Sequence, residues 1–317
     1  MAEWTAYAEQ FVKEDGRVVD NVNGGISHSE SQGYGLLLAY SAGDRAGFER
    51  IWGFTSNELL IRSDRLAAWK WDAAAKPHVV DVNNASDGDI LIAYALGLAG
   101  EDWKDQRYTD AARKLALAIG DNLLTDANNR VVLRPGAEGF GRSENTGTLI
   151  VNASYWIFEA FPTLEKLAPD HPWQQLASSG AELINAARFG PAKLPSDWIA
   201  ISAEGLRPAP DFPAVYGYNA IRIPLYLLRA GAKAGPLLDN FEQAAQSLGP
   251  AIVDIASGHA VEKLADPGYR MIDAALDCAY GTPIPKDLLR FEPTAYYPST
   301  LHLLGLSYVR ERQPQCL

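Results

Sequence analysis

Apolar side chains recur along this chain with the spacing of amphipathic helices. Positions i, i+3, i+4 and i+7 are apolar in many segments, whereas the period-2 alternation of a half-buried strand is scarce. The pattern predicts an all-α protein. The expected helices cover residues 3–13, 29–42, 45–57, 88–100, 107–124, 148–167, 172–188, 217–231, 236–247, 269–280 and 297–310.

Turn-forming residues separate these expected helices. Examples are Asp15-Gly16, Asn23-Gly24-Gly25 and Gly249-Pro250, where Gly and Pro end a helix. The helices follow one another in pairs and are spread evenly along 317 residues, without a linker or a break in composition. We therefore predict one domain, residues 1–317, built as a closed array of helical hairpins.

Charge and composition narrow the classes of function. The formal net charge is -11, which disfavours nucleic acid and anionic membrane surfaces as partners. No uninterrupted apolar run reaches membrane-spanning length, so we expect no membrane insertion. Two cysteines, Cys278 and Cys316, are too few for a disulfide framework or a metal cluster, and the five histidines lack metal-ligand spacing. We expect no metal and no cofactor.

Glu30 lies in a small, polar run, Gly25-Ile-Ser-His-Ser-Glu-Ser-Gln-Gly-Tyr-Gly35, directly before an apolar helical stretch. Backbone N–H groups at a helix start favour an anion, whereas a sugar closing over the site would desolvate the carboxyl and favour its protonated form. Such a carboxyl is suited to acid catalysis. The structural alternative is that Ser27 or Ser29 caps the helix and Glu30 only complements the helix dipole.

Asp87 and Asp89 flank a glycine at a second expected helix start, in Asn84-Ala-Ser-Asp-Gly-Asp89. The pair resembles a fragment of a calcium loop, but the remaining oxygen ligands and the distant Glu of that loop are missing. The structural alternative makes Asp87 the N-cap and places Asp89 in the first turn.

Aromatic residues gather in and beside the expected loops. Sugars lie with their C–H faces on aromatic rings, while their hydroxyls reach nearby acids and amides. Taken singly, each ring is as consistent with core packing, and Trp156 above all. The residues concerned are Trp69, Trp71, Tyr155, Trp156, Trp198, Tyr216, Tyr218, Tyr296 and Tyr297.

The segment Ala85-Ser-Asp-Gly-Asp-Ile-Leu-Ile-Ala-Tyr-Ala-Leu-Gly-Leu-Ala-Gly-Glu-Asp-Trp103 resembles the signature of glycoside hydrolase family 8 over its whole length. This family contains bacterial endoglucanases, xylanases and chitosanases. Further segments follow in the family's order, so that the resemblance runs from about residue 15 to residue 310. They are Asp15 to Asp20, Ser29 to Tyr34, Trp69 to Trp71, Asn152 to Tyr155, Pro195 to Trp198, Tyr218 to Arg222 and Tyr296-Tyr297.

The resemblance implies an (α/α)6 barrel of paired helices with a long cleft that takes several sugar units. It also implies hydrolysis of β-1,4 linkages with inversion. Glu30 matches the family's proton donor, which protonates the leaving glycosidic oxygen. Asp87 matches the carboxylate that holds and distorts the sugar at the cleavage point, and because inversion forms no covalent intermediate, we expect a positioning and electrostatic role for it.

The expected function is that of an endo-β-1,4-glucanase acting on cellulose or soluble cello-oligosaccharides, as an accessory to bacterial cellulose production. Xylan and chitosan are the alternative substrates. Polymeric glucan lies outside the cytoplasm, so we expect a monomeric, periplasmic or secreted enzyme whose sequence is written here in mature form. The matching segments supply the expected substrate-binding residues, which are Gln32, Tyr34, Trp71, Asp89, Tyr155, Trp198, Tyr218, Asn219, Arg222 and Tyr296.

Asn219 departs from the family pattern. Many members carry Asp at this position and use it as the base that activates water, and a neutral amide does not accept a proton at working pH. Three explanations compete: a natural branch that takes its base from elsewhere, a replacement made to trap substrate, or a glucan-binding pseudoenzyme. Asp197, Asp211, Asp72 and Asp87 are the candidate bases of a natural branch.

Overall fold

The computed structural model describes residues 2–143 and 146–317. These residues group into two compact units. The first contains residues 2–125, 133–139 and 160–174, and the second contains residues 126–132, 140–143, 146–159 and 175–317. Four elements include residues of both units, namely β3 (Leu124–Ala127), β4 (Arg130–Leu133), η3 (Phe158–Ala160) and α7 (Trp173–Ala186).

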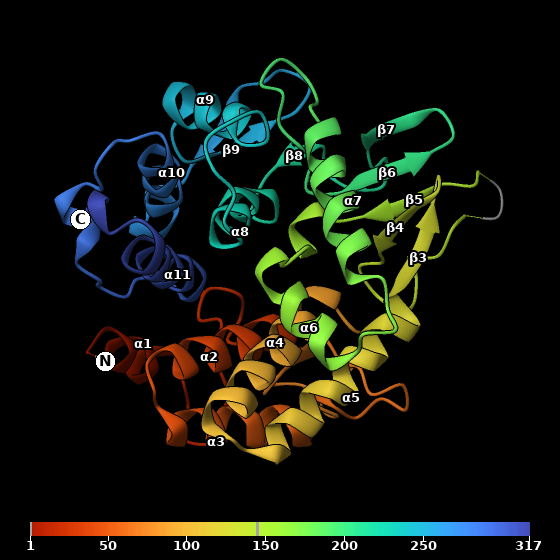
Figure 1. The fold of residues 1–317 in the computed structure, drawn as a ribbon, viewed down its shortest axis with the longest axis vertical. Coiled ribbons are helices and arrows are strands. Elements are labelled where there is room, and N and C mark those ends of the chain that lie inside the picture. Colours follow the sequence, from red (N-terminus) through yellow and green to blue (C-terminus); the bar gives the residue numbers. More distant parts are fainter. Residues whose placement is uncertain (1, 144–145) are drawn as a thin grey trace. The chain divides into compact units, whose positions relative to one another are not determined.

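The first unit is mainly helical; its helices α1 to α5 run from red to yellow in Figure 1, and α6 is light green. Its two short strands β1 and β2 pair antiparallel, with Ser27 opposite Trp71 and His28 opposite Lys70. The elements are α1 (Ala2–Phe11), β1 (Ser27–His28), α2 (Ser29–Ser41), α3 (Arg45–Phe54), the π-helix η1 (Thr55–Leu59), β2 (Lys70–Trp71), α4 (Ser86–Trp103), α5 (Gln106–Leu123) and α6 (Phe161–Leu167).

Most residues of α2 and of α4 are buried, which is typical of inner helices. Helices α3 and α5 bury one face only. Glycines let α2 and α4 touch, because a Cβ on Gly33 would lie 2.5 Å from the Cβ of Leu91. Since no larger residue fits at this contact, the N-terminal halves of α2 and α4 lie side by side.

The second unit combines helices with two small antiparallel sheets, ordered β5-β6-β7 and β10-β9-β8. Most residues of α11 are buried, and α10 packs against this helix (Figure 1). The elements are β5 (Leu149–Val151), η2 (Ala153–Tyr155), β6 (Ile199–Ser202), β7 (Gly205–Pro208), β8 (Val215–Tyr216), η4 (Ala220–Arg222), α8 (Ile223–Arg229), α9 (Asp239–Leu248), β9 (Ala251–Asp254), β10 (Ala260–Lys263), α10 (Pro267–Ala279), η5 (Lys286–Leu289), α11 (Tyr296–Arg312) and η6 (Pro314–Cys316).

Most expected helices are present with ends shifted by a few residues. The expected helix 148–167 is wrong in its first half, where the chain forms β5 and η2 before α6 begins at Phe161. Leu149-Ile150-Val151 is a short apolar run, and periodicity cannot separate a buried strand from a helix over three residues. The expected helix 217–231 begins as an α-helix only at Ile223, because Pro224 suits the first turn of α8. Among the described residues, no helix has the length and apolarity needed to cross a membrane.

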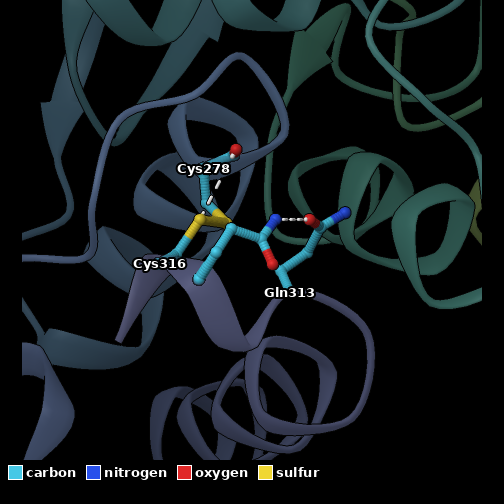
Figure 2. Close-up of a disulfide and its surroundings, with 4 residues drawn as sticks. Cys278, Gln313 and Cys316 are labelled. Carbon is cyan, nitrogen blue, oxygen red and sulfur yellow. Dashed lines mark hydrogen bonds between the residues drawn. A yellow bond between two sulfur atoms is a disulfide. The ribbon is translucent and has the colours of Figure 1, made fainter.

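A disulfide joins Cys278, in α10, to Cys316, in η6 (Figure 2). The two Cα atoms are 6.0 Å apart, as an unstrained bridge requires. The backbone N–H of Cys316 donates to the carbonyl of Gln313 at 2.9 Å, which holds the last turn in place. The sequence pattern does not predict this bridge, because two cysteines 38 residues apart meet only once α11 has packed beside α10.

Removing this bridge is expected to lower stability. Replacing both Cys278 and Cys316 by Ser should reduce the free energy of unfolding by about 2 to 3 kcal/mol, since the closed loop no longer restricts the unfolded chain. Urea titrations of the wild type and the double variant measure the change. An equal midpoint for both proteins, with the bridge verified as formed in the wild type, would contradict the expectation.

Candidate active site

Glu30 stands in the first turn of α2, and 17% of its side chain is exposed. The cap of this helix is His28 rather than Ser27 or Ser29, because the backbone N–H of Ser31 donates to His28 Nδ1 at 3.0 Å. Ser31 completes a capping box, since its hydroxyl accepts the His28 N–H at 3.0 Å. The carboxyl of Glu30 is therefore not needed for capping and is held at a well-defined helix start.

Asp87 is brought to Glu30 by the packing of α4 on α2. A Cβ on Gly88 would lie 2.1 Å from Ser29 Oγ and 2.7 Å from the backbone N of Glu30, so the residue after Asp87 touches the backbone of Glu30. Asp87 is buried, and its Oδ1 accepts the Gly88 N–H at 2.8 Å. Burial raises the pKa of Asp87, against the smaller effect of that hydrogen bond. Ala85 is the N-cap of α4, so Asp87 is a first-turn residue and not the cap.

Asp89 is fully enclosed, and both of its carboxylate oxygens are used within the first unit. Oδ1 accepts the Ala67 N–H at 2.7 Å, and Oδ2 accepts the side-chain amide of Asn84 at 2.7 Å. Asn84 in turn accepts the Ala137 N–H at 2.7 Å. Burial raises the pKa of Asp89, and the nearby charge of Asp87 adds to the shift. Asp89 therefore holds the segments that contain Ala67 and Asn84 against the start of α4.

Gln32 and Tyr34 have no exposed surface in this structure. The Gln32 amide donates to the Gly16 carbonyl at 3.2 Å and to Thr55 Oγ1 at 3.0 Å, and its oxygen accepts the Val18 N–H at 2.6 Å. Gln32 thus ties α2 to the neighbouring loop and to η1. The role of Gln32 and Tyr34 as substrate contacts stays a prediction, because neither side chain is exposed in this structure.

Trp71 is also largely covered, with 8% of the residue exposed. His78 stacks on its ring at a centroid distance of 4.3 Å, and the guanidinium of Arg17 lies 4.9 Å from the same ring centre. The indole N–H donates to Glu58 Oε2 at 2.9 Å. Little of the ring is left for a sugar, so Trp71 as a stacking platform stays a prediction.

The second unit collects aromatic rings around Trp198, which is partly exposed. Phe140 and Phe212 lie nearly parallel to the indole, at centroid distances of 5.6 and 4.3 Å, and Tyr155 meets it edge-on at 6.2 Å. Trp198 and Tyr155 are among the residues predicted from the sequence, whereas Phe140 and Phe212 are not. Each of these phenylalanines is an isolated aromatic in a polar loop, so no pattern pointed to it.

Asp197 holds the turn that carries Asn219. Its Oδ1 accepts the backbone N–H groups of Gly217 and Ala220, each at 2.8 Å. The backbone and side-chain amides of Asn219 also hydrogen-bond to this carboxylate. Burial raises the pKa of Asp197 more than these hydrogen bonds lower it. Asn219, which stands where many family members carry Asp, thus lies in direct contact with the buried carboxyl of Asp197.

Arg222 is a buried cation in the same unit. Its Nη2 donates to Ser154 Oγ at 3.2 Å, and its guanidinium lies 5.8 Å from the ring centres of Tyr155 and Tyr226. Tyr218 is 45% exposed and donates its hydroxyl hydrogen to Glu262 at 3.1 Å.

Tyr296, the first residue of α11, is fully buried, and its neighbour Tyr297 donates to the Tyr218 carbonyl at 2.6 Å. The second unit therefore brings Tyr155, Trp198, Asn219 and Arg222 together, and Tyr218 offers the most exposed ring among them. Tyr296 instead packs inside the unit.

A buried carboxyl in α10 predicts how stability depends on pH. Burial, with a contribution from Asp277, raises the pKa of Asp273 to about 7. Because this folded-state pKa lies above the value of about 3.9 in an unfolded chain, the stabilisation is complete below about pH 4 and is lost as pH rises through about 7. Asp273→Asn should therefore flatten the fall in unfolding free energy between pH 5 and 8, measured by urea titration.

Asp254 provides a control of opposite sign for the Asp273 prediction. Hydrogen bonds from Ser257 hold the pKa of this exposed carboxyl below its usual value. Its contribution is present at neutral pH and is lost only as pH falls into the acid range. Asp254→Asn should leave the slope between pH 5 and 8 unchanged, and an equal effect of both variants would contradict the assignment to Asp273.

The chain is similar to known glycoside hydrolases. A model of glycosyl hydrolases family 8 matches residues 1–311. The probable endoglucanase of Novacetimonas hansenii is 39% identical over 276 residues, which cover 84% of this chain and 79% of that protein. A solved family 8 endoglucanase from Klebsiella pneumoniae has a TM-score of 0.89 at 31% identity, over 98% of this chain and 99% of that chain. The endo-β-1,4-glucanase of Acetobacter xylinum has a TM-score of 0.87 at 33% identity, over 99% and 98% of the two chains.

These likenesses extend over nearly the whole chain. They confirm the predicted all-α class and the (α/α)6 barrel, which the family 8 structures share. The chain belongs to glycosyl hydrolases family 8 and is a glycoside hydrolase.

Proposed function

We propose that this protein is an endo-β-1,4-glucanase that cuts cellulose-type chains internally, as an accessory to bacterial cellulose production. The single observation that carries the proposal is the contact of Gly88 with the Ser29–Glu30 backbone, which sets two carboxyls on adjacent helix starts. The printed names of the relatives, endoglucanase and endo-β-1,4-glucanase, support the substrate class.

In the proposed reaction Glu30 donates its proton to the glycosidic oxygen as the bond from that oxygen to the anomeric carbon breaks. A water molecule attacks the same carbon from the opposite face and loses a proton to a base, so the configuration inverts. Asp87 holds the sugar at the cleavage point and stabilises developing positive charge. The two carboxyls lie in different surroundings, since Glu30 is partly exposed and Asp87 is buried and accepts the Gly88 N–H.

Asn219 is not the base, because its amide does not accept a proton at working pH. We propose instead that Asn219 orients groups in the site while the contacts from Asp197 fix its turn. Arg222 carries a permanent positive charge next to Tyr155, and it would attract sugar hydroxyls or a carboxylate.

Aromatic residues of the second unit are the proposed sugar platforms. Tyr218 is the most exposed of them. Phe140 and Phe212 stack on the Trp198 ring and hold it in place. Gln32, Tyr34, Trp71 and Asp89 are buried in the first unit and Tyr296 is buried in the second, so we propose that each supports the residues that surround it in its own unit.

The activity is tested by following the viscosity of carboxymethyl cellulose alongside the release of reducing ends. An endo-acting enzyme lowers viscosity early, when few ends have been released. Xylan and chitosan, assayed in parallel, should be cleaved much more slowly. Tight cello-oligosaccharide binding in calorimetry without any turnover between pH 4 and 8 would instead identify a glucan-binding pseudoenzyme.

We also propose that residues 1–317 act as one monomeric catalytic domain. The two units each contain separated stretches of sequence, so neither forms from a continuous piece. A single calorimetric transition with equal calorimetric and van't Hoff enthalpies is expected, together with the mass of one chain in light scattering. Two separate transitions would contradict the single domain.

We propose a periplasmic or extracellular location. The disulfide between Cys278 and Cys316 supports this, since disulfides persist in oxidising compartments, and a polymeric glucan is found outside the cytoplasm. Alkylating the protein from intact cells before reduction, followed by mass spectrometry, should leave both cysteines unmodified. Full alkylation of Cys278 and Cys316 in that experiment would favour a reducing compartment.

A further inference from the structure

We propose that Asp197 is a positioning residue that orients the side-chain amide of Asn219, so that Asn219 presents its carbonyl oxygen to the site and holds an O–H group there. This O–H group belongs either to the attacking water or to a sugar hydroxyl of the glucan. The inference rests on the proposed function for the place of Asn219 in the site. It is carried by the contacts that Asp197 makes within the second unit.

The carboxyl of Asp197 is fixed in one position. The residue is 8% exposed, and its backbone N–H donates to the Val215 carbonyl at 2.8 Å. Oδ1 accepts the N–H groups of Gly217 and Ala220, which flank the segment that contains Asn219, each at 2.8 Å. Oδ2 lies against Gly217, because a Cβ on this glycine would be 2.8 Å from that oxygen. The turn that carries Asn219 is therefore closed around the carboxyl.

The side chain of Asn219 can face this carboxyl with only one of its two ends. An amide has an NH2 group that donates and a carbonyl oxygen that accepts, whereas an ionised carboxyl only accepts. Burial raises the pKa of Asp197, and the backbone N–H groups of the turn and the side chain of Asn219 act to lower it, as donors do. The NH2 group of Asn219 therefore points to Asp197, and its carbonyl oxygen points away.

The carbonyl oxygen of Asn219 is placed to accept from a ligand. Asn219 begins η4 without capping it through its side chain, and the residue is partly exposed. Asn152 behaves differently in the same unit, since it is fully buried and its side-chain oxygen accepts the Ser154 N–H at 3.1 Å. The amide oxygen of Asn219 can thus orient an O–H group, although it does not take the proton of that group.

Asp197→Asn tests the orientation with little change in shape. The new amide oxygen can still accept the N–H groups of Gly217 and Ala220, while the new NH2 group replaces an acceptor by a donor. Asn219 must then turn its carbonyl oxygen inward and present its NH2 group to the site. We expect kcat/KM on cellohexaose to fall roughly 10- to 100-fold, with an unchanged far-UV circular dichroism spectrum.

Asp254→Asn is the matched control for this variant. Asp254 lies in the same unit, and its carboxyl likewise accepts a backbone N–H, that of Ser257, at 2.8 Å. The same chemical change is therefore made at a carboxyl outside the proposed site. We expect wild-type rates and wild-type binding of cellohexaose for this control.

Two double variants show whether Asp197 acts through Asn219. In Asp197→Asn/Asn219→Asp, the carboxyl at position 219 accepts with both oxygens whichever way it turns, so kcat/KM should return to within about fivefold of the wild type. Asn219→Ala should lose as much activity as Asp197→Asn, and Asp197→Asn/Asn219→Ala should lose less than about twofold more. Additive losses without any recovery would mean that Asp197 only supports the fold, and would overturn the inference, as would wild-type rates in Asp197→Asn.

Calorimetry with cellohexaose identifies the O–H group. A fall in kcat at an unchanged Kd assigns the attacking water to the Asn219 oxygen. A rise in Kd that accounts for the fall in kcat/KM assigns a sugar hydroxyl.

The outcomes for this inference are separate from those for the proposed function. A wild-type protein that cleaves no glucan rejects the proposed function, and Kd then tests the inference. In that case an unchanged Kd in Asp197→Asn overturns the inference, whereas equal, non-additive rises in Asp197→Asn and Asn219→Ala support it. Cleavage that Glu30→Gln removes, together with wild-type behaviour of Asp197→Asn, rejects only the inference.

Discussion

Replacing Glu30 by Gln is expected to lower kcat on cellulose-type chains by roughly two to four orders of magnitude. The amide keeps the size and much of the hydrogen bonding of the side chain but has no proton to give to the leaving oxygen. Initial rates of reducing-end release from cellohexaose measure the loss. Binding of the same oligosaccharide, measured by calorimetry, should change little, because the amide still occupies the first turn of α2.

Glu9→Gln is the control for this prediction. Glu9 is exposed on α1, so the same change of charge and size occurs away from the proposed site. We expect wild-type rates for Glu9→Gln and an unchanged melting temperature for both variants. Activity of Glu30→Gln within tenfold of the wild type, after exclusion of contaminating cellulase, would falsify the assignment of the acid.

Gly88→Ala is expected to damage both stability and catalysis. The added Cβ would lie 2.1 Å from Ser29 Oγ and 2.7 Å from the backbone N of Glu30, and real Cβ atoms essentially never come so close to backbone. The helices must separate, at a cost of about 1 to 3 kcal/mol of unfolding free energy. A shift of about 1 Å between Glu30 and Asp87 should lower kcat by roughly 100-fold.

Gly53→Ala tests whether this loss comes from the contact or from replacing a helical glycine. Gly53 lies within α3, and a Cβ there would meet nothing within 4 Å. Alanine in an unobstructed helix interior is more favourable than glycine by roughly 0.5 to 1 kcal/mol, so this variant should be stabilised and fully active. Thermal unfolding and kcat of the two variants, measured together, decide the matter. If Gly88→Ala behaves like Gly53→Ala, the close contact does not position the carboxyls.

The helical architecture could be predicted from the local spacing of apolar residues. Segments such as α5 and α10 carry one apolar stripe over several turns, and a stripe of this period has no other way to be buried. Prediction failed where the pattern was short. The strand β5 has three residues and pairs with β6, which begins at Ile199, so its conformation depends on a partner far along the chain.

The candidate site was foreseen in part. The signature around Asp87 and the polar run around Glu30 pointed to acid chemistry on helix starts, and the structure places these starts in contact. The sequence does not indicate which polar residues near Glu30 face inward. Gln32 is two residues from Glu30, yet its amide is consumed by Gly16, Val18 and Thr55 inside the unit.

By itself the sequence determined the helical class, the family signature and the two carboxyls at helix starts, because periodicity and short motifs are properties of neighbouring residues. Only the tertiary structure decided the contacts made over long separations. It chose His28 as the cap beside Asp20, joined Cys278 to Cys316, and set Asp197 against Asn219. Each of these contacts depends on which face of a helix or loop turns toward a distant segment, and that choice follows from packing the whole core.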